Sequence, residues 1–153
     1  MPGMQIPLQD VQQPLPNGLR VIRATEPVHL DDLAVAVSGG FGPPPEVART
    51  VTPDSVLGGD DQNQHLVGYV DDEPVASAEL LATGEIAGVY TVAVPEQHRR
   101  RGYGEALTAA VLAAGRDLGC TIGCLQASAM GRPVYERMGF ETFTDYRIFE
   151  PAP

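Results

Sequence analysis

Residues 89–104 have the sequence VYTVAVPEQHRRRGYG, and this stretch decides the fold. An apolar β-rich run ends at Val94, and a polar, basic turn follows it up to Gly104, where a helix is predicted to begin. A helix N-terminus exposes unpaired N–H groups that carry about half a positive charge in total. Glycines let a phosphate approach them with no Cβ in the way. The stretch therefore predicts a buried strand that leads into a pyrophosphate-binding turn.

Other phosphate-binding loops do not fit this stretch. The Gly-Lys-Ser/Thr ending of a nucleotide-triphosphate loop is absent from the sequence. The three-glycine dinucleotide fingerprint is incomplete and comes late in the chain. Glycines after a strand also serve purely conformational needs, so the motif by itself is weak evidence.

Two groups of elements flank this stretch. Before it, β-rich runs at residues 66–70, 74–81 and 86–94 are joined by short turns, which predicts an antiparallel meander. After it, an apolar stripe at helical spacing predicts a helix over residues 104–118. The next predicted elements are a strand at 122–127, a helix at 132–138 and a final strand or strand pair within 140–149. This order predicts an α/β (α+β) fold with a mixed sheet covered by helices.

The first third of the chain is less informative. Residues 1–18 are rich in proline and glutamine and are interpreted as a tail or an extended strap, followed by a single domain over residues 19–150. A strand is predicted at 19–25, and then a short helix that stops at Gly39 and Gly40. Residues 41–45 form a loop, and a second short helix starts near Glu46.

Composition limits the partners. The chain has 153 residues and a net charge of −10, which argues against nucleic acid or an anionic membrane surface as the general partner. All ten lysine and arginine positions are arginine, and three of them follow His98 directly, which suits a polyanionic cofactor or a solvated turn. Cys120 and Cys124 are expected to be reduced structural thiols, and no metal site is predicted. The absence of a signal-like or membrane-spanning stretch favours a cytoplasmic protein.

The sequence resembles the GNAT acetyltransferases. Arg99-Arg100-Arg101-Gly102-Tyr103-Gly104 is similar to the Arg/Gln-x-x-Gly-x-Gly/Ala motif of that family, and residues 133–140, PVYERMGF, occur in the family's order. The resemblance covers about residues 66–149. It implies a mixed, mostly antiparallel sheet that is splayed between its fourth and fifth strands, here residues 86–94 and 122–127.

The resemblance also implies acetyl-CoA as co-substrate. The diphosphate is expected on the N–H groups of residues 101–104, and the pantetheine arm beside free backbone groups at Val92 and Val94. For Arg99, a structural role is the alternative to cofactor binding. The full set of implied cofactor residues is Val92, Ala93, Val94, Arg99, Arg100, Arg101, Gly102, Tyr103, Gly104, Ser128 and Tyr135. One departure is that Ser128 and Gly131 stand where many relatives have asparagine and alanine, so the shorter hydroxyl of Ser128 must reach the cofactor or its bridging water.

Two residues are predicted to be catalytic. The resemblance places Tyr135 beside the coenzyme sulfur, as donor to the departing thiolate. Transfer to an amine also needs a group that removes a proton, and Glu79 ranks first for this role, ahead of Glu85 and Tyr90. A water chain is the alternative, since the position of the glutamate found in some relatives is occupied here by Gly88 or Tyr90.

The predicted function is transfer of an acetyl group from acetyl-CoA to an amine, in a small molecule or a peptide. Two alternatives stay open: a non-catalytic acyl-CoA sensor of the same fold, and an interaction domain that has lost the cofactor. Residues 41–45 either rim the acceptor pocket or serve only as a turn. A homodimer also stays open.

Overall fold

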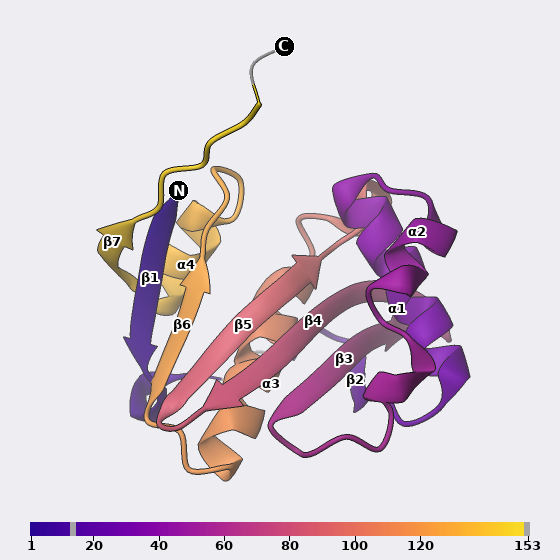
Figure 1. The fold of residues 1–153 in the computed structure, drawn as a ribbon, viewed down its shortest axis with the longest axis horizontal. Helices are drawn as coiled ribbons and strands as arrows, with labels where there is room; N and C mark the ends of the chain where they lie inside the picture. Colours follow the sequence, from indigo (N-terminus) through magenta and orange to yellow (C-terminus); the bar gives the residue numbers. More distant parts are fainter. Residues whose placement is uncertain (13–14, 152–153) are drawn as a thin grey trace.

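A computed structural model describes residues 1–12 and 15–151 of the chain. Helices cover a seven-stranded sheet of order β2-β3-β4-β5-β6-β1-β7 (Figure 1). The strands are β1 (Pro2–Pro7), β2 (Arg20–Arg23), β3 (Asn63–Val70), β4 (Glu73–Thr83), β5 (Ile86–Ala93), β6 (Ile122–Gln126) and β7 (Glu141–Asp145). The α-helices are α1 (Pro27–Phe41), α2 (Pro45–Thr50), α3 (Tyr103–Asp117) and α4 (Arg132–Met138). Short 3-10 turns are η1 (Leu8–Asp10), η2 (Asp54–Val56) and η3 (Glu96–His98).

The predicted meander and the predicted splay are both confirmed. Strands β3, β4 and β5 pair antiparallel in sequence order. Strands β5 and β6 pair in parallel over only three residue pairs, from Ile86↔Ile122 to Gly88↔Cys124. Beyond Gly88 the two strands diverge (Figure 1). The edge of β5 that faces β6 therefore has no strand partner there among the described residues.

The tail interpretation of residues 1–18 is wrong for residues 2–7. These residues form β1, which lies between β6 and β7 and pairs antiparallel with both. Met4 and Ile6 point into the core and are 0% and 1% exposed. The local sequence hid this strand because a six-residue run bounded by prolines has only two inward apolar side chains, and its partners lie far along the chain. Residues 13–14 of the predicted tail lie outside the described residues.

Helix α1 does not stop at Gly39 and Gly40. It continues to Phe41 and ends at Gly42, whose φ of 94° is left-handed. A Cβ on Gly39 would lie 2.7 Å from Cβ of Pro95, and one on Gly40 would lie 2.8 Å from Cβ of Ala93. These two glycines therefore allow the end of α1 to pack closely against the end of β5.

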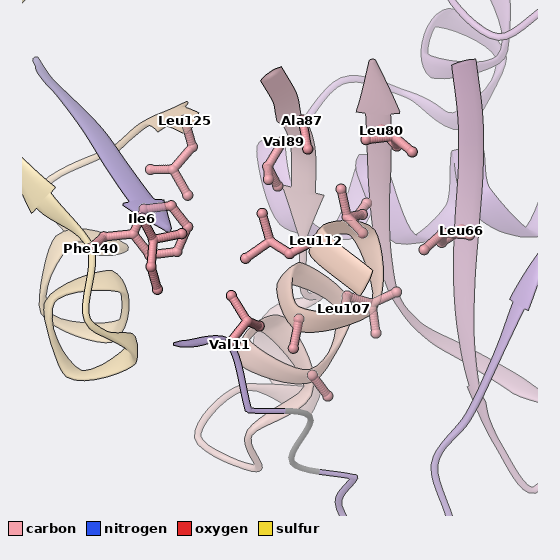
Figure 2. Close-up of a cluster of buried hydrophobic side chains, with 14 of the residues drawn as sticks. Ile6, Val11, Leu66, Leu80, Ala87, Val89, Leu107, Leu112, Leu125 and Phe140 are labelled. Carbon is pink, nitrogen blue, oxygen red and sulfur yellow. The ribbon is translucent and has the colours of Figure 1, made fainter. Parts of the chain in front are cut away.

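The core lies on both faces of the sheet. On one face α3 supplies Leu107 and Leu112, which pack near Leu80 and Val89 (Figure 2). Burying each such leucine stabilises the fold by roughly 1.5–3 kcal/mol relative to leaving it exposed. On the other face, α1 packs against β3 in a second cluster that contains Leu33, Val37 and Val67. Within the described ranges, no helix has both the length and the apolar character needed to cross a membrane.

Candidate active site

A cleft of about 830 Å³ opens where β5 and β6 diverge. It lies between the end of β5, the turn that leads into α3, and the start of α4. Of the predicted cofactor residues, the cleft is lined by Val92, Ala93, Val94, Arg99, Arg100, Gly102, Tyr103, Gly104, Ser128 and Tyr135. Residues that are distant in the sequence are thus brought to one cavity.

The turn before α3 presents backbone N–H groups to the cleft. Gly102 precedes the helix with φ of 80°, a left-handed conformation that favours glycine. The helix begins at Tyr103, and Gly102, Tyr103 and Gly104 all line the cleft. Because the first N–H groups of a helix have no intrahelical partner, this end of α3 is suited to an anionic group.

The three consecutive arginines have different surroundings. Arg99 is partly buried; its Nε donates to the carbonyl of Val94 at 3.1 Å, and its Nη2 donates to the carbonyl of Gly40 at 3.3 Å. Arg99 therefore ties the end of α1 to the end of β5, which supports the structural alternative. Arg100 is exposed and lines the cleft, whereas Arg101 is exposed and is not among the cleft-lining residues of the described chain.

His98 has a role that its position in the sequence did not reveal. The side chain is buried, only 8% of the residue is exposed, and its Nε2 lies 3.1 Å from Oε1 of Glu73 at the start of β4. This contact anchors the basic turn to the sheet. In the sequence His98 only added to a basic cluster, because its burial depends on a partner in another strand.

The opposite wall of the cleft comes from the start of α4. The hydroxyl of Ser128 accepts a hydrogen bond from the N–H of Gly131 at 3.1 Å. The ring of Tyr135 is half-buried and meets Phe140 edge to face, with centroids 5.7 Å apart. Burial raises the pKa of Tyr135, and the nearby hydroxyl of Thr108 acts in the opposite direction. The phenol therefore remains a proton donor at neutral pH.

Glu79 lies on β4, outside the described lining of the cleft. Its Oε2 accepts a hydrogen bond from the hydroxyl of Thr91 at 2.8 Å. Its cross-strand neighbours are His65 on β3 and Tyr90 on β5. Burial lowers the pKa of His65, while Glu79 acts in the opposite direction. Glu85, the other carboxylate considered, is exposed in the turn between β4 and β5.

Further residues line the cleft that the sequence did not assign to the cofactor. Gly40 and Phe41 at the end of α1 contribute to it, so the start of the predicted 41–45 loop does reach the cavity. Arg137 on α4 also lines the cavity, and its Nη1 donates to the carbonyl of Pro133 at 3.1 Å. Its position far along the chain from the basic turn gave no sign of this, because only the packing of α4 places it there.

Comparisons with known proteins identify a family and a shared fold. The family described as acetyltransferase (GNAT) domain matches residues 61–142. A GCN5-related N-acetyltransferase from Kribbella flavida is similar over 92% of this chain and 53% of its own, with 20% identity and a TM-score of 0.73. One from Sphaerobacter thermophilus is similar over 93% of this chain and 48% of its own, with 22% identity and a TM-score of 0.75.

A third solved structure is similar over nearly its whole length. It is AAC(6')-Iy in complex with the bisubstrate analog CoA-S-monomethyl-acetylneamine, with 18% identity, a TM-score of 0.72, and coverage of 88% of this chain and 98% of its own. The chain thus spans about half the length of the Kribbella and Sphaerobacter proteins but nearly all of this one. At these identities the structures show a shared fold, and the family match extends over more than half of the sequence. The chain belongs to the GNAT acetyltransferase family.

Proposed function

We propose that this protein transfers an acetyl group from acetyl-CoA to an amine by direct attack of the amine on the thioester. One observation carries the proposal: a single cleft at the splay of β5 and β6 contains both the glycine-arginine turn before α3 and Tyr135. The first feature suits a diphosphate and the second suits a departing thiolate. Their union in one cavity favours an enzyme over an interaction domain.

The cofactor is held in two places in this proposal. The N–H groups of residues 101–104 bind the diphosphate, and the side chain of Arg100 adds charge from the lining of the cleft. The pantetheine arm runs beside Val92–Val94, where the edge of β5 lacks a strand partner among the described residues. An unpaired strand edge is a template for an extended ligand. Acetyl-CoA supplies the activated thioester carbonyl.

The chain's own groups then assist the transfer. Backbone N–H groups at the end of β5 polarise the thioester carbonyl, and the hydroxyl of Tyr135 donates to the sulfur as the C–S bond breaks. Ordinary pKa values near ~10 for a phenol and ~8.5 for a thiol make full proton transfer uphill by about 2 kcal/mol. Since burial raises the pKa of Tyr135, this cost increases. The phenol therefore stabilises the thiolate mainly by hydrogen bonding, and its proton is transferred late.

The acceptor must lose a proton before it attacks. An amine with a pKa near ~10.4 costs roughly 4–5 kcal/mol to deprotonate at pH 7. Because Glu79 lies outside the described lining of the cleft, we assign this step to water in the open cleft, the alternative to Glu79. The amine class is supported by the acetylneamine analog bound in the similar AAC(6')-Iy structure.

Two free cysteines are consistent with a reaction in the reducing cytoplasm.

Turnover can be tested with a panel of amines. Incubating the protein with acetyl-CoA and small-molecule or peptide amines should release free thiol, and the acetylated amine should appear at the same rate. Cofactor binding without thiol release across a broad panel would favour the acyl-CoA sensor. Calorimetry should show that acetyl-CoA affinity falls as salt is raised, because salt screens the attraction between arginine and phosphate.

A further inference from the structure

Thr91 has an unusual backbone conformation within β5. Its φ is 51°, in the left-handed region. Three other residues besides glycine have positive φ in the described chain: Asp71 and Asp72, in the turn between β3 and β4, and Arg100, in the turn before α3. Thr91 instead lies inside a strand and is β-branched, a combination that the backbone strongly disfavours. Surrounding contacts must therefore hold it there.

The conformation coincides with a β-bulge. The register pairs Glu79 with Tyr90 and Ser77 with Ala93. On β4, one residue separates Ser77 from Glu79. On β5, two residues, Thr91 and Val92, separate Tyr90 from Ala93. The extra residue bends the strand and changes the direction of the backbone that follows. That backbone, Val92–Val94, lines the cleft.

Two side chains of β4 hold the bulge. The hydroxyl of Ser77 donates to the carbonyl of Thr91 at 3.2 Å, and Ser77 is 0% exposed. The hydroxyl of Thr91 donates to Oε2 of Glu79 at 2.8 Å. Ser77 and Glu79 are two positions apart on one strand, so their side chains lie on the same face of the sheet. Together they bind the carbonyl and the hydroxyl of Thr91.

We propose that Ser77 and Glu79 are positioning residues that hold Thr91 in its left-handed conformation and so direct the Val92–Val94 backbone toward the acyl group. Glu79 thus acts through Thr91 and does not take the acceptor's proton. This inference rests on the proposed function, because the direction of that backbone matters for catalysis only if a thioester binds beside it. It also gives Glu79, first considered as a base, a role that needs only a hydrogen-bond acceptor.

Substitutions at the two ends of the Glu79–Thr91 bond separate a positioning residue from a base. Glu79→Gln keeps an oxygen that can accept from Thr91 but cannot take a proton, so kcat should stay within about threefold of wild type. Glu79→Ala and Thr91→Val should each lower kcat by about tenfold or more. The kcat of the double variant should be no lower than that of the slower single variant, because both substitutions remove the same hydrogen bond. Thr91→Gly should keep more activity than Thr91→Val, because glycine adopts positive φ freely.

Two controls and one activity-independent measurement complete the experiment. Thr83→Val at the exposed end of β4 and Glu141→Gln on β7 are matched substitutions away from the cleft and should leave kcat unchanged. Amide NMR spectra of ¹⁵N-labelled protein should show shifted Val92–Val94 signals in Glu79→Ala, a substitution on the neighbouring strand, but much smaller shifts in Glu79→Gln. Wild-type thiol release, measured first, tests the proposed function separately from this inference.

Three results would overturn the inference. One is a Glu79→Gln variant as slow as Glu79→Ala, which would show that the carboxylate is needed as a base. Another is wild-type kcat in Thr91→Val. The third applies even if no amine is turned over: unchanged Val92–Val94 signals in folded Glu79→Ala protein.

Discussion

The two walls of the cleft present different kinds of group: one presents the backbone, and the other presents side chains. On one wall, the end of β5 and the turn before α3 present backbone groups, set by the bulge at Thr91 and the left-handed Gly102. On the other wall, α4 presents side chains, above all the half-buried phenol of Tyr135. The backbone wall depends on conformation, whereas the side-chain wall depends on the identity of single groups. Substitutions on the two walls should therefore fail in different ways.

The largest effect is expected on the side-chain wall. Tyr135→Phe should lower kcat by roughly ten- to a thousand-fold and keep acetyl-CoA affinity within a few-fold, because the ring still packs while the donor is lost. Steady-state kinetics, under conditions where chemistry limits the rate, and calorimetry would measure the two effects. A variant with wild-type kcat would remove Tyr135 from the mechanism.

The pH profile sharpens this prediction. Burial raises the pKa of Tyr135, so its phenol stays protonated, and able to donate, beyond the ordinary value near ~10. Activity that depends on Tyr135 should therefore persist at alkaline pH and decline only above that value. Loss of kcat between pH 8 and 9, ascribed to Tyr135 by comparison with Tyr135→Phe, would contradict the direction of the shift.

The test of the backbone wall is a substitution at Gly102, the left-handed glycine. Gly102→Val should weaken acetyl-CoA binding by over about 1 kcal/mol, because a β-branched residue is strained at φ of 80° and its Cβ blocks phosphate approach. Gly58→Val is the matched control: Gly58 has φ of 75°, and a Cβ added there would meet no atom of the described chain within 4 Å beyond its own neighbours. The control should lose stability but keep its affinity. Equal affinities in the two folded variants would reject the phosphate site.

A smaller effect tests how closely the side-chain wall is packed. A Cβ on Gly131 would lie 2.9 Å from the ring of Tyr135, so Gly131→Ala should displace the phenol. We expect kcat to fall several-fold, about 1 kcal/mol in activation free energy, with little change in affinity. The double variant Gly131→Ala/Tyr135→Phe should be no slower than Tyr135→Phe alone. Additive losses would show that Gly131 acts independently of the ring.

The smallest effect concerns Ser128. Its hydroxyl accepts from the N–H of Gly131, so Ser128→Ala should destabilise the start of α4 by about 0.5–1 kcal/mol, as loss of a similar cap does. A thermal melt would measure this loss, and kcat should fall by less than about threefold. A larger fall in kcat would instead support the predicted contact of Ser128 with the cofactor.

Much of the central fold was predictable because its signals are local. The apolar stripe of α3 and the alternating runs of β3, β4 and β5 follow helix and strand periods within single segments. The correct order of α3, β6 and α4 followed from the same kind of signal. Helix α1 was predicted too short, since the glycines that usually end a helix serve here to pack it against Pro95 and Ala93.

Strand β1 is an element that local sequence signals did not predict. Its six residues carry too few apolar side chains to indicate a strand, and it is stabilised by pairing with β6 and β7, more than a hundred positions away. Such pairing depends on which edges the rest of the fold leaves open, and this information is not present in the segment itself.

By itself, the sequence determined the family, the meander followed by a basic turn and a helix, and the residue types available for binding and catalysis. Only the tertiary structure decided how those residues are used. Arg99 bonds to protein carbonyls, His98 is buried against Glu73, and Glu79 holds the bulge at Thr91. The physical reason is that a turn or a helix is encoded by neighbouring residues, whereas the partner of a polar side chain is set by the approach of strands and helices that are distant in the chain.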